Sequence, residues 1–144
     1  MSTPLKTPQS AFPFIVVDER GAAKLVAQRC TDCGATYADS ARVACGRCAA
    51  RADRLELIEP KLEGSLHSAV IVHRGYPDVP TPFISAVVDL DGGPTLKGTL
   101  RNVPFDPSEI APGRRVKVGF DDALGRIDKL GNSYVAHFFE PIDA

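Results

Sequence analysis

The sequence predicts a mainly β protein in which a small metal-binding ribbon precedes a five-stranded closed barrel. Two observations carry this prediction. All four cysteines fall in one short segment, as two C-x-x-C pairs. Short apolar runs separated by Gly- and Pro-rich turns then recur along the rest of the chain, as is typical of all-β domains. The 144 residues correspond to about one ordinary domain.

The composition is that of a soluble globular protein. Hydrophobic residues make up 44% and charged residues 24% of the chain, and the formal net charge is −1. No apolar run approaches the roughly 20 residues needed to span a bilayer. The N-terminal stretch is polar and broken by proline, unlike a signal peptide. We therefore expect a cytoplasmic protein, in which clustered cysteines bind metal more often than they form disulfides.

The cysteine segment "CTDCGATYADSARVACGRC" predicts a structural zinc site. Two C-x-x-C knuckles can gather four sulfur atoms in the tetrahedron that Zn²⁺ prefers. Four protein ligands leave no coordination position for water, so the site is not expected to be catalytic. Free or disulfide-bonded thiols are the alternative. A redox motif is not expected, because a redox C-x-x-C normally opens a helix in a βαβ context, which is missing here. The predicted ligands are Cys30, Cys33, Cys45 and Cys48.

The segment before the cysteines leaves two structures open. Residues 1–11 are polar and fit a flexible leader. "FIVVD" and "KLVAQ" are apolar runs around a Gly-containing turn and fit a hairpin. A helix over 18–28 is the rival, since Ala, Lys, Leu and Gln favour it. The arm either folds back on its own chain or exposes an apolar patch of the kind that marks interfaces.

Five strands and one short helical insert are expected from Gly64 onward. Asp106 and Pro107 fit the cap and the first residue of one helical turn between the third and fourth strands. Five strands with an insert at this place suit the OB-fold, a small closed barrel. The predicted strands lie in "SLHSAVIVHR", "PFISAVVDL", "GPTLKGTLRNV", "RRVKVGF" and "NSYVAHFFEP". We divide the chain into an N-terminal arm (1–24), a zinc ribbon (25–55) and an OB-fold barrel (56–144).

A rubredoxin-like zinc ribbon joined directly to a small OB barrel resembles the acyl-CoA-associated zinc-ribbon/OB-fold family, catalogued as domain of unknown function thirty-five. The resemblance covers roughly residues 12–141. Family members usually carry prolines between the knuckles, whereas "TYADSARVAC" has none. The matching stretches are "KLVAQRCTDCG", "CGRC", "TPFISAVVDLDGGPTLKGTL", "IAPGRRVKVGF" and "FFEP".

The resemblance implies a non-catalytic subunit that completes a hetero-oligomeric acyl-CoA enzyme and helps it to bind coenzyme A. A thiolase-fold partner is expected first, in catabolism of an aromatic, steroid or other unusual acyl-CoA. An aldolase derived from that fold and a hot-dog-fold enoyl-CoA hydratase are the alternatives. The candidate CoA contacts are Arg74, Lys97, Arg101, Arg115 and Lys117. The candidate partner contacts are Phe12, Phe14, Ile15, Val16, Tyr37, Arg42 and Tyr76.

Catalysis by the chain alone is not expected. His67, His73 and His137 fit strand residues that pack or meet solvent, and His67 is expected to share a strand face with Ala69 and Ile71. The acidic stretch "DDALGRID" fits a solvated hairpin between two strands. No serine has the context of an activated nucleophile.

Nucleic-acid binding is the alternative from another functional class, because OB barrels and zinc ribbons also bind single strands. Charge argues against it. Residues 56–144 carry nine Lys/Arg against thirteen Asp/Glu, whereas phosphate binding needs a basic surface.

Overall fold

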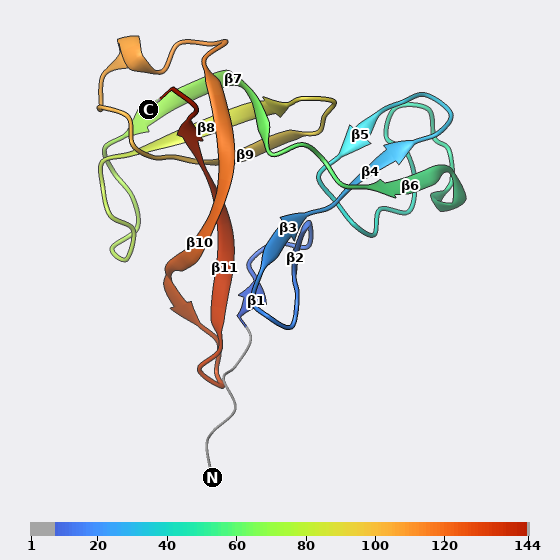
Figure 1. Cartoon of the computed structure of the whole chain (residues 1–144), viewed down its shortest axis with the longest axis horizontal. Coiled ribbons are helices and arrows are strands. Elements are labelled where there is room, and N and C mark those ends of the chain that lie inside the picture. The colour runs from blue at the N-terminus through green and yellow to red at the C-terminus, as the bar shows by residue number, and fades with distance from the viewer. Residues whose placement is uncertain (1–7, 144) are drawn as a thin grey trace.

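The computed structural model describes residues 8–143, which form β-strands and two short 3₁₀ helices (Figure 1). The main sheet has the order β1-β11-β10-β7-β8-β9, and a further pairing of β9 with β11 closes it into a barrel. No helix among the described residues is long and apolar enough to cross a membrane. The strands of this sheet are β1 (Gln9–Ser10), β7 (Glu63–Val72), β8 (Phe83–Leu90), β9 (Thr95–Leu100), β10 (Arg115–Ile127) and β11 (Ser133–Pro141).

Two small sheets lie beside the barrel (Figure 1). One is a hairpin of two strands, and the other has three strands in the order β5-β4-β6. The second carries the cysteine segment between its strands. Their bounds are β2 (Ile15–Val17), β3 (Ala23–Leu25), β4 (Ala27–Cys30), β5 (Thr36–Tyr37) and β6 (Leu55–Ile58), with the 3₁₀ helix η1 (Ala52–Arg54) before β6.

The five long strands confirm the predicted OB-type barrel. Consecutive strands pair antiparallel from β7 to β9 and again from β10 to β11. The barrel closes where Phe139 of β11 lies opposite Leu100 of β9 in a parallel pairing. Phe139 is fully buried, and Ile84, Val88 and Val116 surround it in the same core cluster. Alternating apolar residues on each strand thus fill the barrel, as the period of two requires.

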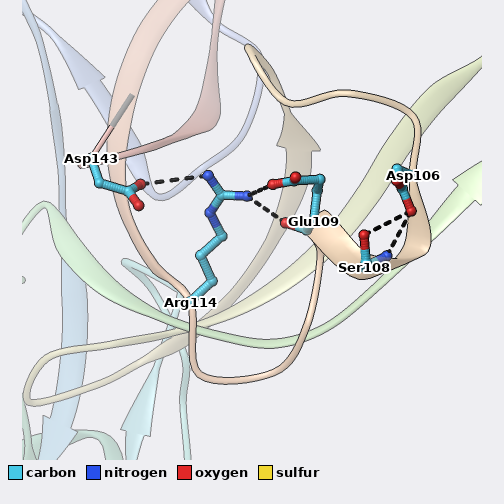
Figure 2. Close-up of polar contacts among 5 residues, drawn as sticks. All are labelled: Asp106, Ser108, Glu109, Arg114 and Asp143. Atoms are coloured by element: carbon cyan, nitrogen blue, oxygen red, sulfur yellow. Dashed lines mark hydrogen bonds and ion pairs between the residues drawn. The ribbon is translucent and has the colours of Figure 1, made fainter.

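The predicted helical insert is present as η2 (Pro107–Glu109). The carboxylate of Asp106 accepts a hydrogen bond from the backbone N–H of Ser108 at 2.9 Å, which caps the turn. Arg114 then ties the insert to the C-terminus, because its guanidinium reaches Glu109 at 3.0 Å and Asp143 at 3.5 Å (Figure 2). The insert is therefore capped at its start by Asp106 and tied at its end to Arg114.

A β-bulge in β7 overturns one expectation about the histidines. The register of β7 against β8 shifts between Leu66 and Ser68. Beyond the bulge Ala69 and Ile71 pack against the core, while His67 is exposed beside Asp89. The prediction that His67 shares their face was wrong, because an extra residue in one strand changes which side chains point inward.

The stretch "DDALGRID" lies almost entirely within β10, so the hairpin turn comes later than predicted. The chain reverses around Asp128, whose carboxylate accepts hydrogen bonds from the backbone N–H groups of Leu130 and Asn132 at 2.8 Å each. The Asn132 side chain also donates to this carboxylate. This bond, followed by the backbone N–H of Asn132, contributes most to lowering the pKa of Asp128 to about 2. A long β10–β11 hairpin extends past the barrel as a result (Figure 1).

The N-terminal arm folds back on its own barrel. The predicted hairpin is present as β2 and β3, with Ile15 opposite Leu25, and the rival helix over 18–28 is absent. Ile15 and Leu25 are each 2% exposed and belong to the barrel core. Phe12 and Val16 keep 43% and 40% of their surface exposed. Residues 1–7 of the predicted leader lie outside the described residues.

His137 of β11 lies between β9 and the N-terminal arm. Its Nε2–H donates to the backbone carbonyl of Lys97 at 2.7 Å. The rings of Phe12 and Phe14 meet the imidazole edge to face, each with a centroid distance of 5.4 Å. The buried Nδ1 has no partner among the described residues. Burial therefore lowers the pKa of His137 and favours the neutral ring.

The three-stranded sheet contacts the barrel at the β8–β9 turn. Gly93 in this turn has φ of 78°, and a Cβ added there would lie 2.3 Å from Oγ1 of Thr36 on β5. Only glycine permits both the backbone conformation and this close approach. The contact fixes how the cysteine segment sits against the barrel.

Replacing Ile15 tests whether the arm is part of the core. Ile15→Ala should lower the free energy of unfolding by about 2–5 kcal/mol, the usual cost of truncating a buried aliphatic side chain. Val16→Ala is the matched control and should cost about 0.5 kcal/mol or less, because the side chain is largely exposed. Denaturant titration measures both. Equal losses for the two variants would show that the arm is not docked.

His137 predicts a pH dependence of stability. An unfolded histidine has a pKa of about 6.5, and burial holds the folded pKa below it, so the unfolded state binds the proton first. The contribution of neutral His137 to stability should therefore be fully present above about pH 6.5. The free energy of unfolding should fall as the pH drops through that value. His137→Gln should have a flatter profile between pH 8 and pH 5. Identical pH profiles for wild type and variant would contradict this account.

Candidate metal centre and barrel hollow

The two C-x-x-C pairs form knuckles with the same backbone geometry. In the first, the N–H of Gly34 donates to the carbonyl of Cys30 at 2.8 Å, and in the second, the N–H of Ala49 donates to the carbonyl of Cys45 at 2.9 Å. Gly34 and Ala49 both adopt positive φ, at 80° and 63°. The positive φ of the second knuckle therefore falls on an alanine after the second cysteine.

The four sulfur atoms lie close enough to hold one metal ion. All of them are within 4.8 Å of one another. The Sγ atoms of Cys30 and Cys48 are 3.6 Å apart, and those of Cys33 and Cys45 are 3.5 Å apart. A Zn–S bond of about 2.3 Å places sulfurs about 3.8 Å apart in a regular tetrahedron. The cluster fits one tetrahedral ion, as the sequence predicted.

Tyr37 supports the cluster from β5. Its hydroxyl accepts a hydrogen bond from the N–H of Gly46 at 2.9 Å and lies 3.3 Å from Sγ of Cys45, to which it donates. The Arg42 guanidinium stacks on the Tyr37 ring at 4.0 Å. Sequence reasoning considered Tyr37 only as a partner contact, as it also did for Arg42 at a partner surface, and missed the bond of Tyr37 to the cluster, for which the spacing of the cysteines gives no signal. Their contact with a partner stays a prediction.

The thiol pKa values show what crowding does to the cluster. The Tyr37 hydroxyl, helped by the N–H of Cys48, lowers the pKa of Cys45 to about 6. The N–H of Ala50 lowers that of Cys48, but burial and the neighbouring thiols outweigh it and raise the pKa to about 12. One thiolate therefore forms easily, and further ones are opposed. A divalent cation removes this opposition, because it binds the deprotonated sulfurs directly.

Three of the five candidate CoA contacts are paired with carboxylates. The Arg115 guanidinium pairs with Asp91 at 2.5 Å and lowers the pKa of the Asp91 carboxyl. Lys117 lies 3.6 Å from Glu140. Arg101 pairs with Asp121 at 2.7 Å and stacks on Phe138 at 4.2 Å. The side chains of Arg74 and Lys97 have no ion-pair partner among the described residues, and both are exposed.

A surface hollow of about 410 Å³ lies beside Lys97 and Arg101. Its lining comes from β8, β9, the β10–β11 hairpin, the arm and the loop before β8. Phe12 of the arm also borders this hollow, whereas Tyr76, which is 83% exposed, does not line it. Sequence reasoning did not find the hollow, because its walls come together only in the folded barrel.

Replacing one cysteine tests whether a metal holds the ribbon. Cys33→Ser should release the backbone of residues 30–55 to rapid amide hydrogen exchange while the barrel strands stay protected, because the ribbon buries few apolar groups of its own. Thr31→Ser is the control in the same knuckle and should exchange like wild type. Unchanged protection of the ribbon in Cys33→Ser would contradict a metal-dependent fold.

Comparison with known proteins places the barrel. Residues 58–121 match the family model of the ChsH2 C-terminal OB-fold domain. The chain is similar in structure to a solved Ltp2-ChsH2(DUF35) aldolase, with a TM-score of 0.61 and 24% identity over 82% of this chain and 84% of that chain. No curated protein matches the sequence. The barrel thus matches a ChsH2-type OB-fold domain over residues 58–121, and the fold agrees with the resemblance to the zinc-ribbon/OB-fold (DUF35) family.

Proposed function

We propose that this chain is a small, non-catalytic subunit of an enzyme complex that processes an acyl-CoA. The observation that carries the proposal is the similarity in fold, over 82% of the chain, to the solved Ltp2-ChsH2(DUF35) aldolase. The similar structure is named as an aldolase with two components, Ltp2 and ChsH2. A chain of this fold is thus found with a second component in an enzyme.

Structural zinc is part of the proposal. The four cysteine sulfurs supply the soft, tetrahedral donor set that Zn²⁺ favours. Binding one ion would neutralise part of the thiolate charge and hold the two knuckles together. A site with four cysteine ligands leaves no open position for substrate, so the ion would support the fold rather than the chemistry.

The surroundings of His137 and His67 support a non-catalytic role for this chain. His137 is buried and its Nε2–H is taken by the Lys97 carbonyl. His67 has Asp89 as its polar partner and lies on the exposed side of β7. Among the described residues, neither pairs with a serine, threonine or cysteine side chain that could act as a nucleophile. The reacting groups are therefore proposed to belong to the larger subunit.

For the partner, we propose an enzyme of the aldolase or thiolase class that acts on an aromatic, steroid or other unusual acyl-CoA. The sequence resemblance put a thiolase-fold partner first. The similarity to the Ltp2-ChsH2(DUF35) aldolase favours the aldolase, which we now place first. A hydratase partner remains the alternative.

Contact with coenzyme A is proposed for Arg74 and Lys97 among the five basic candidates. Their side chains have no ion-pair partner among the described residues, whereas Arg101, Arg115 and Lys117 are engaged by carboxylates. The loop that carries Arg74 also contributes Val79 and Pro80 to the hollow beside Lys97. These two cations are therefore the candidates whose charge is available to a phosphate presented at the edge of a subunit interface.

Reconstitution tests the proposal. The tagged chain is purified from its source cells, the co-purifying large subunit is identified and expressed separately, and acyl-CoA cleavage is measured for each subunit and for the mixture. The mixture should be active and this chain alone inactive. Turnover by the isolated chain would contradict the proposal, as would retention on single-stranded DNA without any acyl-CoA enzyme in the complex.

A further inference from the structure

The hollow beside β9 is built from residues too small to fill it. Its floor includes Gly98, Ala123 and Ala136. A Cβ at Gly98 would lie 2.8 Å from the Phe139 ring and 2.9 Å from Nε2 of His137. Any larger residue at position 98 would displace the two side chains that seal the barrel at this edge. The packing of Phe139 and His137 thus requires glycine at position 98, which also lines the hollow.

The walls of the hollow are apolar and partly exposed. Phe12, Phe83 and Phe138 line it, and Leu124 adds a further apolar side chain from the hairpin. Phe12 is 43% and Leu124 55% exposed. Ile15 is buried in the core, so Phe12 and Val16 carry the exposed apolar surface of the arm. Two exposed apolar side chains, one from the arm and one from the hairpin, therefore border the same hollow.

The rim of the hollow is positively charged although the chain as a whole carries a net charge of −1. Lys97, Arg101 and Arg126 line it, and Asp122 is its only carboxylate. Asp121 neutralises Arg101, and the Asp122 carboxylate accepts a hydrogen bond from the N–H of Gly125. Within the described part of the chain, the side chains of Lys97 and Arg126 have no ion-pair partner.

We propose that this hollow is the main docking point of the larger subunit, and that it receives an apolar side chain flanked by carboxylates. The inference rests on the proposed function and adds the place and chemistry of the contact. An apolar centre with a polar rim is the usual anatomy of a subunit interface, and a few anchors in such pockets carry most of its binding energy. The positive rim selects an acidic segment.

Two variants separate the apolar and the charged parts of the contact. Ala123→Phe fills the floor, and Arg126→Glu reverses a rim charge without occupying the hollow. Ala111→Phe and Lys24→Glu are the matched controls, because both residues are exposed and outside the hollow. Thermal unfolding of each variant shows whether it folds, and Arg126→Glu keeps the test valid if Ala123→Phe does not.

The measurement is calorimetric titration of each variant with the large subunit that co-purifies with wild type and with coenzyme A alone. Ala123→Phe and Arg126→Glu should each weaken binding of the large subunit at least tenfold, and the controls should bind as wild type. Raising the salt concentration should weaken wild type more than Arg126→Glu. If wild type binds no acyl-CoA enzyme, the proposed function fails. If it binds one and both hollow variants bind equally well, or if coenzyme A alone binds in the hollow, only this inference is overturned.

Discussion

Four sulfur atoms within 4.8 Å of one another are the constraint on which the ribbon depends. So many thiols cannot all ionise together without a cation, and the opposite pKa shifts of Cys45 and Cys48 show this conflict. The ribbon cluster has only Cys30, Cys45 and Leu55 as buried members. Apolar burial of that size cannot offset the entropy of ordering the segment. A metal ion is the interaction that can resolve the repulsion and supply the missing stability.

The position of the ribbon relative to the barrel is set by close contacts between them. Thr36 lies one residue from Tyr37, whose hydroxyl donates to Cys45, and Thr36 also packs against Gly93 in the β8–β9 turn. Neighbouring residues of the strand β5 thus contact both the sulfur cluster and the barrel. On the other side, the arm inserts Ile15 into the barrel core. The two small sheets are therefore fixed to the barrel at separate points.

Much of the fold could be predicted because local signals agreed with one another. Turn glycines, alternating strands and the Asp106–Pro107 cap predicted the barrel and its insert, and paired knuckles predicted the sulfur cluster. The bulge in β7 could not be predicted, because an extra residue leaves the apolar pattern of "SAVIV" readable in either phase. The long β10 strand was missed because its distal half is acidic and exposed, so alternation gives no signal there.

Some parts of the candidate sites could likewise be predicted from the sequence, and others could not. The cysteines could be placed from spacing alone, because metal coordination is local in sequence. Other features depend on contacts between segments distant in the chain. These are the bond of Tyr37 to the cysteine cluster, the bond of His137 to β9, and the hollow lined by Gly98. Ion pairs also decide which cations are available. A sequence cannot show that Asp91 engages Arg115, or that Lys97 has no carboxylate partner within residues 8–143.

The most direct test of the account is the metal content of the native protein. Native mass spectrometry of freshly purified chain should show one zinc ion bound. Removing the ion with a chelator should expose residues 30–55 to rapid amide exchange while β7 to β11 stay protected. A fully folded ribbon with no metal bound, or with iron giving a thiolate charge-transfer spectrum, would contradict it.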